Sequence, residues 1–179
     1  ALRQNNPAIE KVIGTDIIDI HQTLDDPRVR FCLQRKEDNY RIPVEDGEAD
    51  FVILNDVLHH SEDVETLLKD VYRILKPNGK VIIVEDTFSD ILSPSFPTLN
   101  RPLTERFLEL SKEQKMSIFS FIDWFGNILV GGLENMPIPC NFKSMEEWET
   151  VFRRHGFNLD YSQFIGFIAG VFHKPSTGL

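Results

Sequence analysis

The sequence predicts an α/β fold built on a mostly parallel β-sheet. Short apolar runs alternate with amphipathic helical stretches in the first half of the chain, as expected of strand–helix–strand units. The chain has 179 residues, of which 41% are hydrophobic and 26% are charged, and this composition is typical of folded globular proteins. We therefore expect one domain spanning residues 1–179.

Four strands are expected in the first half of the chain. Residues 11–16 and 29–33 are short β-type runs, while residues 51–54 and 81–84 are unbroken apolar runs. Unbroken apolar runs are typical of central parallel strands that helices cover on both faces. We therefore expect the side chains of the last two strands to be buried in the core.

A helix is expected between these last two strands. Ser61 is a suitable N-cap, and Glu62 and Asp63 would then lie in the first turn, near the positive end of the helix dipole. Apolar residues follow at helical spacing: Val64, Leu67, Leu68, Val71, Ile74 and Leu75. Residues 76–79, Lys-Pro-Asn-Gly, end the helix because proline cannot continue it. The whole segment predicts a right-handed βαβ unit.

Residues 87–141 differ from the first half of the chain in composition and are expected to form a helical, aromatic-rich insertion. Prolines punctuate two helical stretches, at about 104–115 and 117–125. The many aromatic rings of this segment either pack as core or form the wall of an apolar substrate pocket. For the second alternative we expect Phe88 and Trp124 to contact the substrate.

The C-terminal part predicts one more helix and an antiparallel strand pair. Ser144 is a suitable N-cap for a helix over 145–155, and Gly156 is suited to the left-handed position that follows a helix. Residues 157–164 and 166–173 have the character of two strands at a sheet edge.

Charge and cysteine content exclude several classes of function. Asp and Glu outnumber Lys and Arg by 28 to 19, for a net charge of -9, which gives no attraction to nucleic acid. The apolar runs are far shorter than the roughly 20 residues of a membrane span. Cys32 and Cys140 form no Cys-x-x-Cys motif, and no basic, apolar leader is present. We expect a cytoplasmic protein without a nucleic-acid partner or a membrane span.

Polar residues follow each of the four expected strands. Because the carboxyl ends of parallel strands form the ligand-binding edge of an open α/β sheet, these residues are the candidate site. Asp16 is the strongest of them, since a carboxylate matches the two hydroxyls of a ribose, although it also suits the capping of a turn. The others are Asp38, Asn39, Asn55, Asp56, Glu85 and Asp86.

Several segments together resemble a known family. They are IPVEDGEADFVILNDVLHH at 42–60, LKPNGKVIIV at 75–84, MEEW at 145–148 and HGF at 155–157. As a set they resemble the class I S-adenosylmethionine-dependent methyltransferases, most closely the branch that methylates small molecules. The resemblance covers about residues 8–86 and 140–173. It implies a Rossmann-like, mostly parallel sheet with an antiparallel C-terminal strand pair.

The resemblance also implies a cofactor and its contacts. The cofactor is S-adenosylmethionine, and the product is S-adenosylhomocysteine. By position, Asp16 would hold the ribose hydroxyls and Ile17 would lie against the adenine. Asp38 would accept a hydrogen bond from the adenine amino group, and the Asn39 backbone N–H would meet a ring nitrogen. Asn55 would lie near the methionine part, mainly through its backbone.

One feature of the resembled family is absent from the sequence. No Gly-x-Gly motif occurs in the 179 residues, whereas the family's glycine-rich loop follows its first strand. Three explanations stay open: an upstream segment of the native protein, closure by another chain or by rearranged pairing, or a different strand assignment. We expect the first of these, with the first strand missing from this sequence.

The adjacent histidines 59 and 60 have three interpretations. With Asp63 they suggest a metal site, but adjacent side chains at a helix start point in different directions and no third ligand is evident, so we expect no metal. They also suit packing or polar contacts in the first turn. The functional alternative places His60 at the substrate as a catalytic base or hydrogen-bond partner, and His59 in substrate binding.

Taken together, the resemblance implies S-adenosylmethionine-dependent methyl transfer to a small, partly apolar molecule. The alternative is a catalytically inactive methyltransferase-like domain that acts as a binding or scaffold module. A nicotinamide enzyme is a third possibility, because an acid after the second strand serves a ribose there too. The sequence leaves the methyl acceptor open, as well as the formation of a homodimer.

Overall fold

The computed structural model describes residues 7–17, 26–88, 101–132 and 136–161. It divides into two compact units, one made of residues 1–52 and 66–81 and the other of residues 53–65 and 82–179. Each unit is described separately. The part of the chain that is described contains three two-stranded sheets.

In the first unit, β1 (Val12–Asp16) pairs in parallel with β2 (Val29–Leu33). The register places Val12 opposite Val29 and Asp16 opposite Leu33. Both strands were predicted, and the β2 bounds agree with the prediction residue for residue. The backbone N–H of Gln34 donates to the Asp16 carbonyl at 2.8 Å, which extends the pairing to the ends of both strands.

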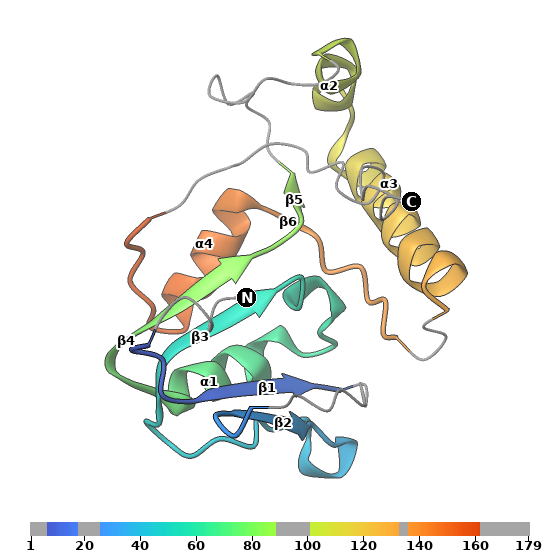
Figure 1. Ribbon diagram of the computed structural model, residues 1–179. Helices are drawn as coiled ribbons and strands as arrows, with labels where there is room; N and C mark the ends of the chain where they lie inside the picture. The colour runs from blue at the N-terminus through green and yellow to red at the C-terminus, as the bar shows by residue number, and fades with distance from the viewer. Residues whose placement is uncertain (1–6, 18–25, 89–100, 133–135, 162–179) are drawn as a thin grey trace. The chain divides into compact units, whose positions relative to one another are not determined.

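The next sheet contains β3 (Ala49–Asn55) and β4 (Leu75–Val84), whose arrows run in the same direction (Figure 1). The expectation that both faces of these strands are buried is wrong. Alternate side chains of a strand face opposite sides, and the described elements cover one side only. Leu54 is buried, whereas the exposed side carries Phe51 (63% exposed) and Ile53 (54%), with Ile82 and Val84 in the neighbouring strand.

Helix α1 (Val64–Ile74) lies between β3 and β4 in the chain, as predicted, and buries Leu68, Val71 and Ile74. The predicted N-cap is wrong. Residues 58–60 form a short 3-10 turn, η2 (Leu58–His60), after which Ser61 is extended and α1 begins only at Val64. The acid in its first turn is Glu65. The Ser61 carbonyl instead accepts a hydrogen bond from Asn141 Nδ2 at 2.6 Å.

The predicted end of this helix is confirmed, but no separate turn follows it. β4 begins at Leu75, so Lys-Pro-Asn-Gly lies within the strand, where Asn78 has a φ of 66°. A Cβ on Gly79 would lie 2.9 Å from the Lys76 carbonyl oxygen and 3.2 Å from that of Ala49. Glycine is therefore needed at position 79 for close approach of the backbones.

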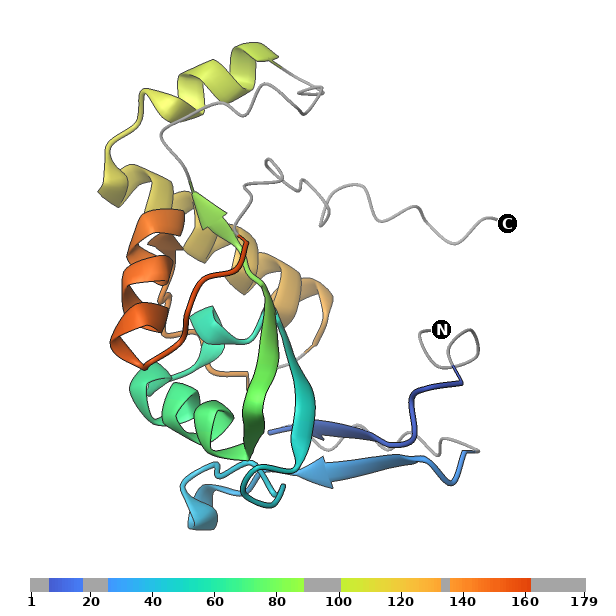
Figure 2. The ribbon, with the colours of Figure 1, turned by 90° about the vertical axis from the view of Figure 1, so that its left-hand side faces the viewer.

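The insertion is helical, but its helices break earlier than predicted. They are α2 (Arg101–Leu108) and α3 (Lys112–Trp124), and a π-helical turn, η3 (Phe125–Val130), continues α3 (Figure 2). The Ser111 side chain accepts from the Gln114 backbone, and the Gln114 side chain accepts from the Ser111 backbone. This capping box starts α3 at Lys112, so the predicted break after residue 115 is wrong.

The second unit also contains a short parallel pair, β5 (Thr87–Phe88) and β6 (Lys143–Ser144), and helix α4 (Met145–Arg154). Ser144 caps α4 as predicted, and Gly156 has a φ of 85°. Residues 157–161 form no strand, so the strand predicted over 157–164 is wrong for that part. Residues 162–164 and the strand predicted over 166–173 lie outside the described residues.

The core of the second unit includes Leu58, Phe88, Phe142 and Trp148. In the described part of the chain, no helix has the length and apolar character needed to cross a membrane.

Candidate functional site

Acidic side chains gather where β3 and β4 end, in the second unit. The Asp56 backbone N–H donates to the Val84 carbonyl at 2.9 Å, which brings the ends of the two strands together. Burial and the nearby charge of Glu85 raise the pKa of Asp56, and burial and the charge of Asp56 raise the pKa of Asp86. The residues that follow these two strands thus lie close together. Asn55 is exposed and donates through Nδ2 to Asp56 at 3.0 Å.

His59 lies beside this acidic group. Its side chain is 2% exposed, and its Nδ1 forms a hydrogen-bonded ion pair with the Glu85 carboxylate, which is 5% exposed. The other Glu85 oxygen accepts from the Leu58 backbone N–H at 2.9 Å. The His59 ring stacks on Phe142, with ring centroids 4.8 Å apart. Position and orientation of the ring are thus both determined by its neighbours.

His60 is held by a different partner. Its Nδ1 lies 2.9 Å from the Pro137 carbonyl oxygen. A carbonyl oxygen only accepts, so Nδ1 carries the proton of this hydrogen bond. The His60 ring centroid lies 4.1 Å from that of His59. The prediction that the two adjacent side chains point apart is therefore wrong, because these partners turn both rings toward the same side.

Asp123 of α3 completes the cluster. Its Oδ1 lies 3.6 Å from His59 Nε2 and 3.4 Å from His60 Nε2, and its side chain is 8% exposed. Asn127 Nδ2 donates to this same oxygen at 2.6 Å. The other oxygen, Oδ2, is buried and has no hydrogen-bond partner among the described residues. No pattern in the sequence indicates Asp123, because no local motif links it to histidines so distant in the chain.

The carboxylates control the protonation of His59. Burial of the ring lowers its pKa, but the hydrogen bonds to Asp123 and Glu85 and their negative charges outweigh burial and raise the pKa to about 10. The His59 ring is therefore protonated on both nitrogens, as an imidazolium, at neutral pH.

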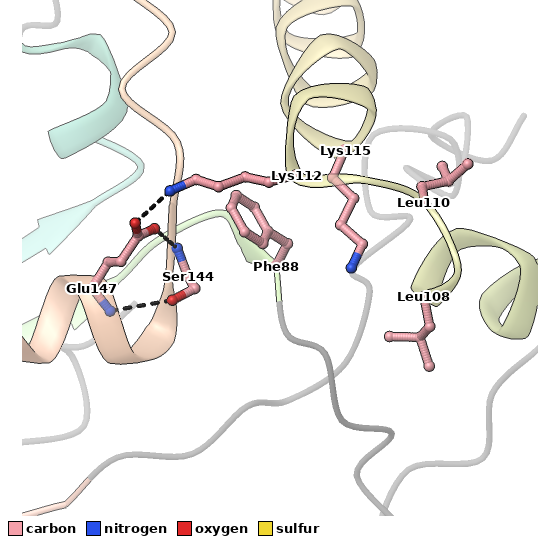
Figure 3. A pocket seen from close by; sticks show the side chains of 7 residues that line it. All are labelled: Phe88, Leu108, Leu110, Lys112, Lys115, Ser144 and Glu147. Atoms are coloured by element: carbon pink, nitrogen blue, oxygen red, sulfur yellow. Dashed lines mark hydrogen bonds and ion pairs between the residues drawn. The ribbon is translucent and has the colours of Figure 1, made fainter.

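A cavity of about 420 Å³ lies elsewhere in the same unit (Figure 3). Phe88, Leu108 and Leu110 form its apolar lining, and Lys115, which is 3% exposed, supplies an ammonium group. The amine lies 5.9 Å from the centre of the Phe107 ring. The dashed lines in Figure 3 mark the Glu147 contacts, among them the ion pair with Lys112.

Aromatic rings connect the cavity lining with His59. The ring centroids of Phe88 and Phe119 are 6.3 Å apart, and those of Phe119 and Phe142 are 5.3 Å apart. Phe142 in turn stacks on His59. Phe88 is 4% exposed and lines the cavity, in keeping with its predicted contact with a substrate. Trp124 is 42% exposed, and its ring centroid lies 6.3 Å from that of Phe121. The substrate roles of both residues stay predictions.

The first unit contains four of the five residues predicted to bind the cofactor. Asp16 ends β1 and Ile17 follows it, and both are half-buried. Asp38 ends a 3-10 turn, η1 (Lys36–Asp38), and Asn39 follows with a φ of 53°; both are exposed. Two carboxylates that accept hydrogen bonds and a backbone N–H that donates one suit the hydroxyls and the base of an adenosine, so the residues present fit the group. Asn55 lies in the second unit.

Comparison with known proteins bears on the first half of the chain. A family model described as "Methyltransferase domain" matches residues 2–83. A demethylmenaquinone methyltransferase of Lactococcus lactis is 28% identical over 120 residues, which are 65% of this chain and 41% of that protein. The protein of the same name from Lactobacillus johnsonii is 35% identical over 80 residues, which are 41% of this chain and 33% of that protein.

The uncharacterized protein YafE of Escherichia coli is 28% identical over 109 residues, which are 58% of this chain and 49% of that protein. The chain thus spans about half the length, or less, of these relatives. The matched residues contain the parallel strands β1 to β3 and almost all of β4, the elements of the predicted Rossmann-like sheet. Residues 2–83 are thus similar to a methyltransferase domain, which supports the resemblance to the class I S-adenosylmethionine-dependent methyltransferases.

Proposed function

We propose that this chain takes part in the transfer of a methyl group from S-adenosylmethionine to a small, partly apolar molecule. The observation that carries the proposal is the buried His59, His60 and Asp123 cluster, joined by aromatic rings to an apolar cavity, in a chain with a methyltransferase domain. The family supports the donor of the methyl group, and the second unit supports the nature of its acceptor.

The cofactor supplies an electrophilic methyl group on a sulfonium, so the protein mainly has to bind and orient the reactants. Asp16 would hold the ribose hydroxyls, Ile17 would cover the adenine, and Asp38 and Asn39 would recognise its edge. Asn55 would contact the methionine part. These roles follow from the position of each residue relative to the strands and from the family resemblance.

The cavity supports an acceptor that combines an apolar body with an oxygen. A volume of about 420 Å³ is within the range of small-molecule sites. Phe88, Leu108 and Leu110 would contact the apolar part. The buried Lys115 amine would donate to a carbonyl or a phenolate oxygen. Two relatives carry the name demethylmenaquinone methyltransferase, so a reduced naphthoquinone is a suitable first acceptor for this chain.

The histidine cluster supports a role in handling the acceptor proton. His60 has its Nδ1 proton on Pro137, which leaves Nε2 to accept a hydrogen bond in the neutral ring. We assign His60 as the catalytic base or hydrogen-bond partner, and His59, whose ring centroid lies 4.1 Å from that of His60, as a substrate-binding residue. A base makes a limited contribution, since a phenolate is already nucleophilic.

The test is calorimetric titration of S-adenosylhomocysteine into the folded chain, followed by an assay of product formation with S-adenosylmethionine and a reduced naphthoquinone. We expect binding, turnover, and a raised KM in Lys115→Met with unchanged affinity for S-adenosylhomocysteine. Lys76→Met is the control, because Lys76 is exposed, is paired with Asp50 and does not line the cavity.

A folded chain that binds no S-adenosylhomocysteine would contradict the proposal. It would instead favour the binding or scaffold module.

A further inference from the structure

Three side chains of the second unit have the composition and spacing of a metal site. The ligand atoms that His59, His60 and Asp123 offer all lie within 4.8 Å of one another. The two histidines come from the turn η2 and the aspartate from α3. We propose that these residues bind a divalent transition-metal ion, with Zn²⁺ as its representative.

The orientation of both imidazoles supports this proposal. Histidines that bind a metal through one ring nitrogen usually donate the other N–H to a carboxylate or a backbone carbonyl, which fixes the tautomer. His59 has its Nδ1 on the Glu85 carboxylate, and His60 has its Nδ1 on the Pro137 carbonyl. Each ring thus directs its Nε2 toward Asp123. Each ring is therefore held in the orientation that an ion bound by the two Nε2 atoms requires.

The aspartate supplies an independent observation. Oδ2 of Asp123 is buried without a hydrogen-bond partner among the described residues, although the side chain is 8% exposed. A buried carboxylate oxygen without a partner is costly. A cation bound by Asp123 removes this cost, and the Glu85 carboxylate behind His59 adds to the negative potential.

The ligand types decide which ions fit. Two imidazoles and one carboxylate suit Zn²⁺ and its transition-metal neighbours, whereas Mg²⁺ and Ca²⁺ prefer sites built from oxygen alone. Three protein ligands leave at least one coordination position for water or for an oxygen of a bound molecule. Since the ion would occupy Nε2 of His60, the role of His60 as a base applies to the metal-free chain.

Protons compete with the metal for the same atoms. His59 Nε2 lies 3.6 Å from Asp123 Oδ1, and an ion bound by this nitrogen takes the place of any proton on it, so binding releases protons from the cluster. The inference does not rest on methyl transfer, since metal binding is measured directly and without cofactor or acceptor.

The test is calorimetric titration of ZnCl₂ into the chelator-treated, folded chain, together with the visible absorption spectrum of the Co²⁺-loaded protein. We expect one Zn²⁺ ion to bind per chain, with the same affinity and stoichiometry in the presence of excess Mg²⁺. Glu85→Gln, which removes the carboxylate behind His59, should weaken binding by about 10- to 100-fold. Asp123→Asn and His60→Gln each remove a ligand and should weaken it further.

His155→Gln is the matched control, because His155 is also buried, with its Nδ1 2.9 Å from the Val151 carbonyl oxygen and its Nε2 2.8 Å from Glu65. It should bind Zn²⁺ as the parent chain does. No binding by the folded parent chain, or equal affinity in folded Asp123→Asn and His60→Gln, would overturn the proposal. Circular dichroism confirms the fold of each variant, and Asp123→Asn, which preserves side-chain volume, keeps the test valid if His60→Gln does not fold.

Discussion

His59 and Glu85 form an ion pair that is almost completely removed from solvent, with side chains that are 2% and 5% exposed. The pair joins the turn η2 to the end of β4, because Glu85 also accepts a hydrogen bond from the Leu58 backbone. A buried pair of this kind makes each partner dependent on the other, since removal of one leaves the other without compensation.

The first prediction concerns this pair. Glu85→Ala should lower the free energy of unfolding by about 3–5 kcal/mol, because it leaves a buried imidazolium with one carboxylate fewer. Urea unfolding with a chelator present measures the loss. Asp50→Ala is the control, because Asp50 forms an exposed pair with Lys76 and should lose no more than about 1 kcal/mol. Equal losses in the two variants would show that the buried pair has no special importance.

The second prediction concerns cofactor binding in the first unit. Asp16→Ala should weaken the binding of S-adenosylhomocysteine by about 1–3 kcal/mol, the cost of leaving hydroxyl partners without an acceptor. Glu37→Ala provides an acidic control in the same unit, where Glu37 is exposed in η1. Calorimetry measures both. Unchanged affinity in folded Asp16→Ala would remove Asp16 from the site.

The third prediction concerns the close approach at Gly79. Gly79→Ala should destabilise the protein by more than about 1 kcal/mol, because the added Cβ would meet two backbone carbonyl oxygens that do not easily move. Gly14→Ala is the matched control in β1, where the nearest atom is a Phe31 ring carbon at 3.4 Å. Thermal unfolding of both variants distinguishes them, and a more stable Gly79→Ala would contradict the geometry described for β4.

The fourth prediction is a pH dependence at the start of α4. The Lys112 ammonium, and then the Ser144 backbone N–H, hold the pKa of Glu147 below its ordinary value of 4.5. A lowered pKa in the folded state means that the stabilisation is present above pH 4.5 and is lost as the pH falls through the folded-state pKa. Since the pair is exposed, its size is at most about 1 kcal/mol.

Glu147→Gln should therefore be less stable than the parent chain at pH 7, and the difference should shrink below pH 4.5. Urea unfolding across this range measures it, with Glu146→Gln as the control in the same helical turn. A difference that stays constant between pH 7 and pH 3 would mean that the charge of Glu147 has no part in it.

Local sequence patterns predicted much of the secondary structure. The β2 bounds, the buried stripe of α1, the Ser144 cap and the left-handed Gly156 were all predicted correctly. Each depends on residues a few positions apart, within which alternation, helical spacing and capping hydrogen bonds act. The errors at Ser61 and after residue 115 were errors of boundary: α1 begins at Val64 and α3 at Lys112.

The resemblance to methyltransferases also came from the sequence alone, because its motifs are contiguous, and the family model that matches residues 2–83 supports it. Three features were decided only by tertiary structure: the meeting of Asp123 with His59 and His60, the cavity beside Phe88, and the exposed face of β3 and β4. Each depends on which distant segments pack together. Burial and charge interactions join residues that are far apart in the chain, so no regular spacing in the sequence indicates them. Hydrogen bonds within a helical turn join residues three or four positions apart, and this spacing is visible in the sequence.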